Sequence, residues 1–127
     1  MKTDSKLLTE TELELMTVIW TLGQASVHDV QAKLPKSRDL AYTSISTILR
    51  ILEKKAVLST HKGGRGHVYV PLITKSEYET KTLRHVVDRV FDGTPLNMVR
   101  QLLDSSTISK EEIAELKKLI NAHEAKT

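Results

Sequence analysis

The sequence contains no cysteine, no secretion signal in its first residues, and no apolar run of the roughly 20 residues that a membrane-spanning helix needs. The absence of cysteine excludes disulfides, thiolate metal sites and cysteine nucleophiles, and it fits a reducing compartment. A chain of 127 residues suffices for one modest domain, or for one small domain with a helical segment attached, but not for a large enzyme pocket. We therefore expect a small cytoplasmic protein.

Catalytic motifs are also missing, since the chain has neither a nucleophile elbow nor a metalloprotease motif. The glycine cluster at residues 63–66 joins two expected strands, whereas a nucleotide phosphate loop joins a strand to a helix. His61 and His67 flank this cluster and could face each other, but two imidazoles without a nearby carboxylate make a poor metal site. The sequence thus predicts a protein that is not an enzyme and that uses no cofactor and no metal.

Positive charge is concentrated in the middle of the chain. Residues 33–65 carry eight basic and two acidic side chains, whereas residues 73–127 carry nine of each. A basic middle beside a neutral C-terminal part is typical of a polyanion-binding module attached to a segment that binds protein. The eight basic residues are Lys33, Lys36, Arg38, Arg50, Lys54, Lys55, Lys62 and Arg65.

Capping signals and hydrophobic periodicity divide the chain into helices and one hairpin. Ser26 can cap a short helix that Pro35 ends, and Thr94 followed by Pro95 favours another helix start. Capping boxes, in which a hydroxyl residue precedes a glutamate by three positions, occur at Thr9 with Glu12, Thr74 with Glu77, and Ser109 with Glu112. We expect helices at residues 9–23, 26–34, 41–55, 74–91 and 94–103 and from residue 109 onward, with a hairpin within residues 57–73.

These elements predict a mainly α fold with a small β-hairpin wing. In the first helix, Leu13, Met16, Ile19 and Trp20 form the expected inward stripe. Helix, short helix, helix and hairpin within the first 73 residues are the layout of a winged helix-turn-helix. We expect residues 1–73 to form a DNA-binding domain and residues 74–127 to form a helical dimerisation domain.

The helix at residues 41–55 has two faces. Ile45, Ile48, Leu49 and Leu52 repeat at helical spacing and form the inward face. The other faces carry hydroxyl residues with no acid among them, although hydroxyl residues are mediocre helix formers. We therefore favour a surface that binds a ligand over one that only faces solvent or contacts another protein. Short side chains near the helix start can reach base edges in the major groove, and long basic ones further along can reach phosphate. The predicted DNA-binding residues are Tyr42, Thr43, Ser44, Thr47, Arg50 and Lys54 on the helix, with Lys55 beside them, and Lys62 and Arg65 on the wing.

Two longer stretches carry family-specific motifs. LTETELELMTVIWTLGQASVHDV contains L-T-x-x-E-x-x-x-M-x-x-I-W, and DLAYTSISTILRILEKKAVLSTHKGGRGHVYVPLI contains Y-T-[ST]-[IV]-x-T-x-L-x-x-L-x-x-K. By these motifs the chain resembles the penicillinase-repressor (BlaI/MecI) family of bacterial winged-helix transcriptional repressors. The similarity extends more weakly to the C-terminal SKEEIAELKKLI and so covers nearly the whole chain.

This resemblance implies a homodimeric repressor that reads a palindromic double-stranded DNA operator, with the same DNA-facing residues. In the β-lactam-responsive members, which connect the family to antibiotic resistance, a sensor-linked protease cuts the C-terminal helices. Alignment by position puts that bond at Gln101–Leu102, where the familiar pair is Asn-Phe. The copper-responsive branch uses a Cys-x-Cys motif that this chain lacks, so that mechanism is excluded. The expected dimerisation residues are Val87, Val90, Phe91, Met98, Leu102, Ile113, Leu116 and Ile120.

One alternative comes from a different functional class. A helical protein-interaction module could use the basic patch to bind an acidic partner, and the apolar residues of the last helix could pack on their own chain. We favour an intersubunit seam, because a winged helix of this length needs little further covering.

Overall fold

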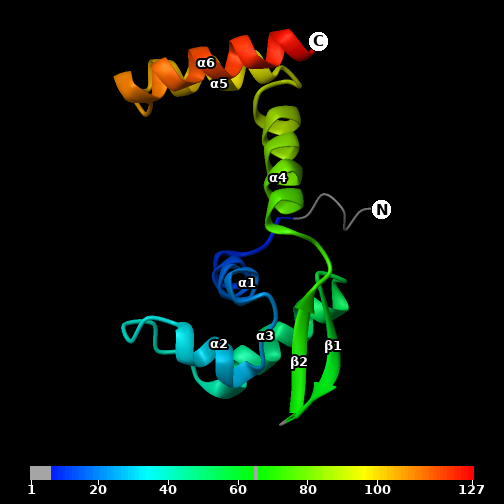
Figure 1. Cartoon of the computed structure of the whole chain (residues 1–127). Coiled ribbons are helices and arrows are strands. Elements are labelled where there is room, and N and C mark those ends of the chain that lie inside the picture. Colours follow the sequence, from blue (N-terminus) through cyan, green and yellow to red (C-terminus); the bar gives the residue numbers. More distant parts are fainter. Residues whose placement is uncertain (1–6, 65) are drawn as a thin grey trace. The chain divides into compact units, whose positions relative to one another are not determined.

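The computed structural model describes residues 7–64 and 66–127. Three helices are followed by a two-stranded hairpin and by three further helices (Figure 1). This order confirms the predicted mainly α fold with a β-hairpin wing. The elements are α1 (Glu10–Leu22), α2 (Val27–Lys33), α3 (Tyr42–Lys54), β1 (Leu58–Gly63), β2 (Gly66–Pro71), α4 (Lys75–Val90), α5 (Pro95–Asp104) and α6 (Lys110–Lys126).

The chain forms two compact units, one ending at Leu83 and the other starting at Arg84. Helix α4 contributes its first part to the first unit and its last part to the second. The functional division expected from the sequence, into residues 1–73 and 74–127, stays a prediction. None of the described helices is long and apolar enough to cross a membrane.

The helix starts follow the capping signals. At α1, the Glu12 amide donates to Thr9 Oγ1 (3.1 Å) and the Thr9 amide donates to Glu12 Oε1 (2.9 Å). The same reciprocal pattern occurs at the other two predicted capping boxes, and Asp29 completes one with Ser26 at α2. These predictions are therefore confirmed, because each motif acts within four residues.

The prediction of a side-chain cap at Thr94 is wrong. Thr94 lies at the N-cap of α5, and Pro95 follows at the first helical position, but the Thr94 hydroxyl makes no capping hydrogen bond. The Asn97 amide, which such a hydroxyl would accept from, donates to the Thr94 carbonyl instead (3.0 Å). The chain enters α5 through this backbone turn.

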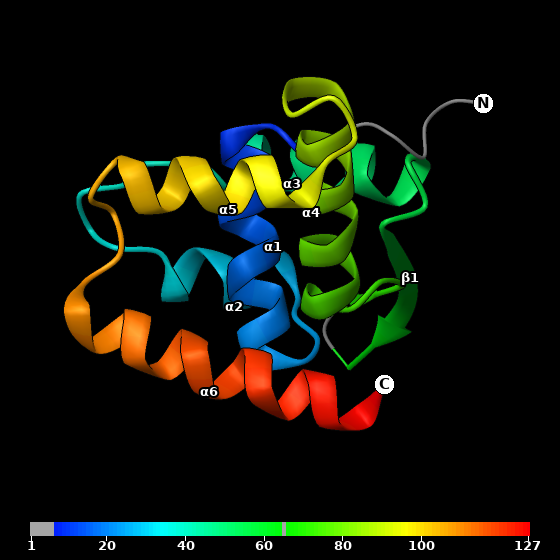
Figure 2. The same cartoon turned by 90° about the horizontal axis from the view of Figure 1, so that it is seen from above.

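The core of the first unit lies where α1, α2 and α3 meet the hairpin. Figure 2 shows the same elements from above. The core side chains are Leu15, Met16, Ile19, Ala25, Val27, Val30, Ile45, Leu49, Leu52, Leu58 and Tyr69.

Within α1 the predicted inward stripe is partly wrong. Leu13 is 37% exposed, whereas Leu15 is fully buried. Leu13 lines a shallow apolar hollow with Trp20 and residues of α4, so α1 has one apolar side toward α3 and another toward α4. A single-face pattern could not distinguish these two sides.

The hairpin is fixed to the rest of the first unit by its own pairing and by one backbone bridge. β1 and β2 are antiparallel, with Leu58 opposite Pro71 and Gly63 opposite Gly66. Tyr69 is buried, and its backbone exchanges two hydrogen bonds with Ala25 in the turn between α1 and α2 (3.0 and 2.8 Å). The hairpin is therefore held beside α3 by backbone hydrogen bonds as well as by packing.

Trp20 connects α1 to the first part of α4. Its indole Nε1 donates to the Ile73 carbonyl (2.9 Å), and its ring centroid lies 5.8 Å from that of Tyr78. The Tyr78 hydroxyl accepts from the Leu8 amide (3.0 Å). Trp20 thus has the structural role that its position on an apolar helix face predicted.

Candidate nucleic-acid interface

Helix α3 is buried on one side and exposed on the other. Ile45, Leu49 and Leu52 are fully buried, and Ile48 is half-buried. The opposite side, which faces solvent in the chain, carries Thr43, Thr47, Arg50 and Lys54. The two-faced helix predicted from the sequence is therefore present, and its exposed face combines hydroxyls with cations.

The start of α3 is chemically suited to an anion. Ala41 is the N-cap and has no side chain that could accept from the first amides of the helix, and the first turn contains no acid. Thr43 and Ser44 are exposed there. The Thr47 hydroxyl donates its proton to the Thr43 carbonyl (2.9 Å), so its oxygen can still accept a hydrogen bond from a ligand. Uncompensated amides at a 13-residue helix start, together with the helix dipole, favour a phosphate oxygen.

Tyr42 and Arg50 lie toward the hairpin side of this face. The Tyr42 ring packs on His28 of α2, with centroids 4.7 Å apart. Arg50 donates from Nη2 to Ser46 Oγ (3.3 Å). Both side chains contact neighbouring residues of the protein and yet remain exposed to solvent.

A hollow of about 370 Å³ lies between the exposed part of α3 and the hairpin, lined by Arg50, Glu53, Thr60, Tyr69 and neighbouring residues of α2 and β2. Burial raises the pKa of the Tyr69 phenol, and the charge of Glu53 raises it further, against the opposing effect of Arg50, so Tyr69 stays neutral. The buried Thr60 hydroxyl, as a hydrogen-bonding neighbour of the phenol, acts on the pKa of Tyr69 in the lowering direction. The hollow lies on the side of α3 that carries Tyr42 and Arg50.

The wing presents Lys62 to solvent near the end of β1. The strand register places Lys62 opposite His67 and His61 opposite Val68. Because neighbouring residues of a strand point to opposite faces, the two histidines do not face each other, contrary to the geometry considered from the sequence. Arg65, the other predicted wing contact, lies outside the described residues.

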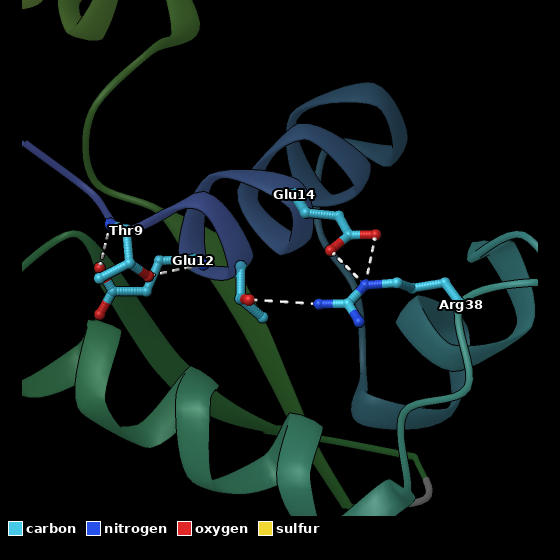
Figure 3. Close-up of polar contacts among 5 residues, drawn as sticks. Thr9, Glu12, Glu14 and Arg38 are labelled. Carbon is cyan, nitrogen blue, oxygen red and sulfur yellow. Dashed lines mark hydrogen bonds and ion pairs between the residues drawn. The ribbon is translucent and has the colours of Figure 1, made fainter.

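Two residues of the basic middle pair with carboxylates of α1. The Nζ of Lys55, which we expected beside the groove wall, lies 2.8 Å from Oε2 of Glu12 on a side chain that is 38% exposed, and its contact with DNA stays a prediction. The Arg38 Nε lies 2.8 Å from Oε1 of Glu14 (Figure 3). Burial would raise the pKa of Glu12, but hydrogen bonds from Lys55 and Thr9 and the charge of Lys55 outweigh it and hold the pKa below its ordinary value.

The C-terminal helices leave much of their apolar surface uncovered in the single chain. α5 and α6 overlap in Figure 1 and are seen apart in Figure 2, and neither contains a buried residue. Gln101 and Leu102, the predicted cleavage pair, are both exposed on α5. Among the predicted dimerisation residues, Val87 is buried, Phe91, Met98, Ile113 and Leu116 are half-buried, and Val90, Leu102 and Ile120 are exposed.

Two bacterial regulatory proteins resemble this chain over most of its length. The penicillinase repressor of Bacillus licheniformis is 34% identical over 116 residues, which cover 91% of each chain. The methicillin resistance regulatory protein MecI of Mammaliicoccus sciuri is 25% identical over 114 residues, which cover 90% of this chain and 93% of MecI.

A solved structure resembles the N-terminal part. The solution structure of the DNA-binding domain of the repressor BlaI superposes with a TM-score of 0.50 and 38% identity, covering 56% of this chain and 87% of that domain. The family model described as "Penicillinase repressor" matches residues 8–122. The chain therefore belongs to the penicillinase repressor family, whose members are transcriptional repressors and not enzymes.

Proposed function

We propose that the chain is a cytoplasmic homodimeric repressor that occupies a palindromic DNA operator through α3 and the wing. The exposed face of α3 carries this proposal, because it places hydroxyls and cations on a helix whose other side is fixed in the core. A relative that is 34% identical is a penicillinase repressor, and a solved relative of the N-terminal part is a DNA-binding domain. The rival reading, a protein-interaction module with an acidic partner, shares the positive charge but requires no hydroxyl face.

In this proposal, different residues would have different tasks. Thr43, Ser44 and Thr47, together with Tyr42, would face base edges, and Arg50, Lys54, Lys62 and Arg65 would face the sugar-phosphate backbone. Two copies of α3 related by a dyad would read half-sites about 34 Å apart, or a multiple of that distance. Such a mode requires a dimer.

Unburied apolar side chains support the dimer. Val90 is 65% exposed, and Leu119 and Ile120 on α6 are also exposed. Apolar residues at helical spacing on a helix without buried residues are typical of a seam that a second chain covers. We place the dimer contact on the eight residues predicted from the sequence, within residues 74–127.

Substitutions on the exposed face of α3 test DNA reading. Lys54→Gln should weaken binding to operator and random DNA alike and lower the salt dependence of binding by about one counterion, because Lys54 would contact phosphate. Thr47→Ala should weaken operator binding roughly 5- to 100-fold and leave random DNA unaffected, because it removes a base contact. Fluorescence anisotropy at several salt concentrations measures both.

The matched control is Lys118→Gln, which changes the same charge on α6, away from α3 along the chain, and should leave both DNA affinities unchanged. Equal effects of Thr47→Ala on operator and random DNA would refute the base-reading role. Binding without salt dependence in the unchanged protein would favour the acidic-partner reading.

Relief of repression would follow cleavage of α5 between Gln101 and Leu102 by a sensor-linked protease. A protease needs extended backbone, and in the single chain α5 has no buried residue to hold it helical. Because Met98 and Leu102 belong to the proposed dimer contact, cleavage would require α5 to leave that contact first. Incubation of the purified repressor with a membrane sensor-protease encoded beside its gene should give a single cut at Gln101–Leu102 by mass spectrometry. Cuts elsewhere, or an intact chain, would reject this site.

A further inference from the structure

Both ends of α3 are attached to α1 by ion pairs. Arg38 lies in the loop before α3, and Lys55 directly follows its last residue. Their carboxylate partners, Glu14 and Glu12, lie in the N-terminal half of α1. The helix that would read DNA is therefore bracketed by two contacts to one neighbouring helix.

Two nitrogens of the Arg38 guanidinium make the contact to α1. Nε donates to both oxygens of Glu14 (2.8 and 3.1 Å), and Nη2 donates to Thr11 Oγ1 (3.2 Å; Figure 3). The loop itself is folded by hydrogen bonds from the Arg38 amide to the Pro35 carbonyl (2.8 Å) and from the Leu40 amide to the Arg38 carbonyl (3.1 Å). A guanidinium held at three acceptor atoms fixes where this loop delivers the start of α3.

The Lys55 contact involves a carboxylate that is largely removed from water. Glu12 is only 6% exposed, accepts from Lys55 Nζ (2.8 Å) through Oε2, and accepts from the Thr9 amide through Oε1. Just after Lys55, Ala56 adopts a left-handed conformation (φ 64°) that turns the chain toward β1. The pair therefore holds the point at which α3 ends and the hairpin begins.

We propose that Arg38 and Lys55 are positioning residues, which set the orientation of α3 for operator reading and do not themselves contact DNA. Each cation is next to a carboxylate at 2.8 Å, which cancels most of its attraction for a phosphate. The inference rests on the proposed function, since it concerns which residues of the basic segment act on DNA.

Removal of the carboxylates distinguishes positioning from direct phosphate contact, because the two roles predict opposite changes in operator affinity. If Arg38 and Lys55 position α3, Glu14→Gln and Glu12→Gln should each weaken operator binding roughly tenfold, about the loss of one well-placed base contact, with random-DNA affinity and salt dependence unchanged. If these cations instead contact phosphate, releasing them from their carboxylates should tighten binding and steepen its salt dependence. An increased or unchanged operator affinity in both variants overturns the proposal.

Matched controls come from the same helices. Glu10→Gln makes the same change in the first turn of α1, at a residue that forms none of the ion pairs found in the described part of the chain. It should leave operator binding unchanged. Arg38→Gln and Lys55→Gln should also preserve the salt dependence, whereas Lys54→Gln should reduce it.

Folding is monitored in the same samples by thermal unfolding, because breaking a buried pair destabilises a protein. The Arg38–Glu14 pair is partly exposed, so its loss costs little stability. If the Glu12 variant unfolds, the Glu14 variant alone therefore decides whether the proposal holds. A variant that is simply unfolded loses operator and random DNA together, in contrast to the selective loss expected here. Failure of the unchanged protein to prefer its operator would refute the proposed function and not this assignment.

Discussion

Replacement of Ile120 by aspartate is expected to convert the dimer into a monomer and to weaken operator binding at least roughly 100-fold, because the second half-site would no longer be bound at high effective concentration. Ile120 is 53% exposed in the single chain, so the substitution has little effect on the packing of that chain. In a dimer seam, however, it would bury a carboxylate without a partner. Sedimentation velocity measures the oligomeric state, and titration of the full operator measures the affinity.

The control for this prediction is Ala122→Asp. Ala122 is exposed and lies two residues further along α6, about 200° around the helix from Ile120, so it adds the same charge on the opposite side. It should remain dimeric and bind the operator normally. The Ile120 variant should still bind an isolated half-site as the unchanged protein does. A dimeric Ile120→Asp protein would show that the subunits meet elsewhere.

The parts of this fold that the sequence predicts correctly are those that depend on neighbours along the chain. Capping boxes act over three residues, and the buried and exposed sides of α3 follow from helical spacing within one element. Gly23, whose φ is 91°, ends α1 at the predicted point for the same reason. These features need no knowledge of the tertiary structure.

Apart from the local Thr94 cap, the sequence analysis misses contacts that join residues distant in sequence. Lys55 reaches Glu12 across 43 positions, and Arg38 reaches Glu14 across 24. Neither pairing leaves a periodic signal, so the charge count included both cations in the basic middle without finding their partners. A buried Glu12 in a capping box was the missed residue, and its second oxygen is free for a distant cation because the cap uses only the first.

The stability of α3 and its proposed reading of DNA depend on opposite faces of one helix. Leu49→Ala should lower the free energy of unfolding by about 2–5 kcal/mol, because Leu49 is fully buried and its truncation leaves a cavity that the neighbouring helices fill only partly. That is a large part of the roughly 5–15 kcal/mol by which natural domains are stable. Urea unfolding at one fixed protein concentration measures the change, since the proposed dimerisation would make stability depend on concentration.

Ile51→Ala is the control, since it removes a β-branched residue from the same helix at a position that is 41% exposed. Its effect on the unfolding free energy should stay below about 1 kcal/mol, because little apolar surface is returned to water. Comparable losses for both variants would mean that a second chain buries Ile51, and α3 would then be part of a protein interface. If only Leu49→Ala greatly lowers the unfolding free energy, the outer face of α3 contributes little to folding and is available to bind the operator.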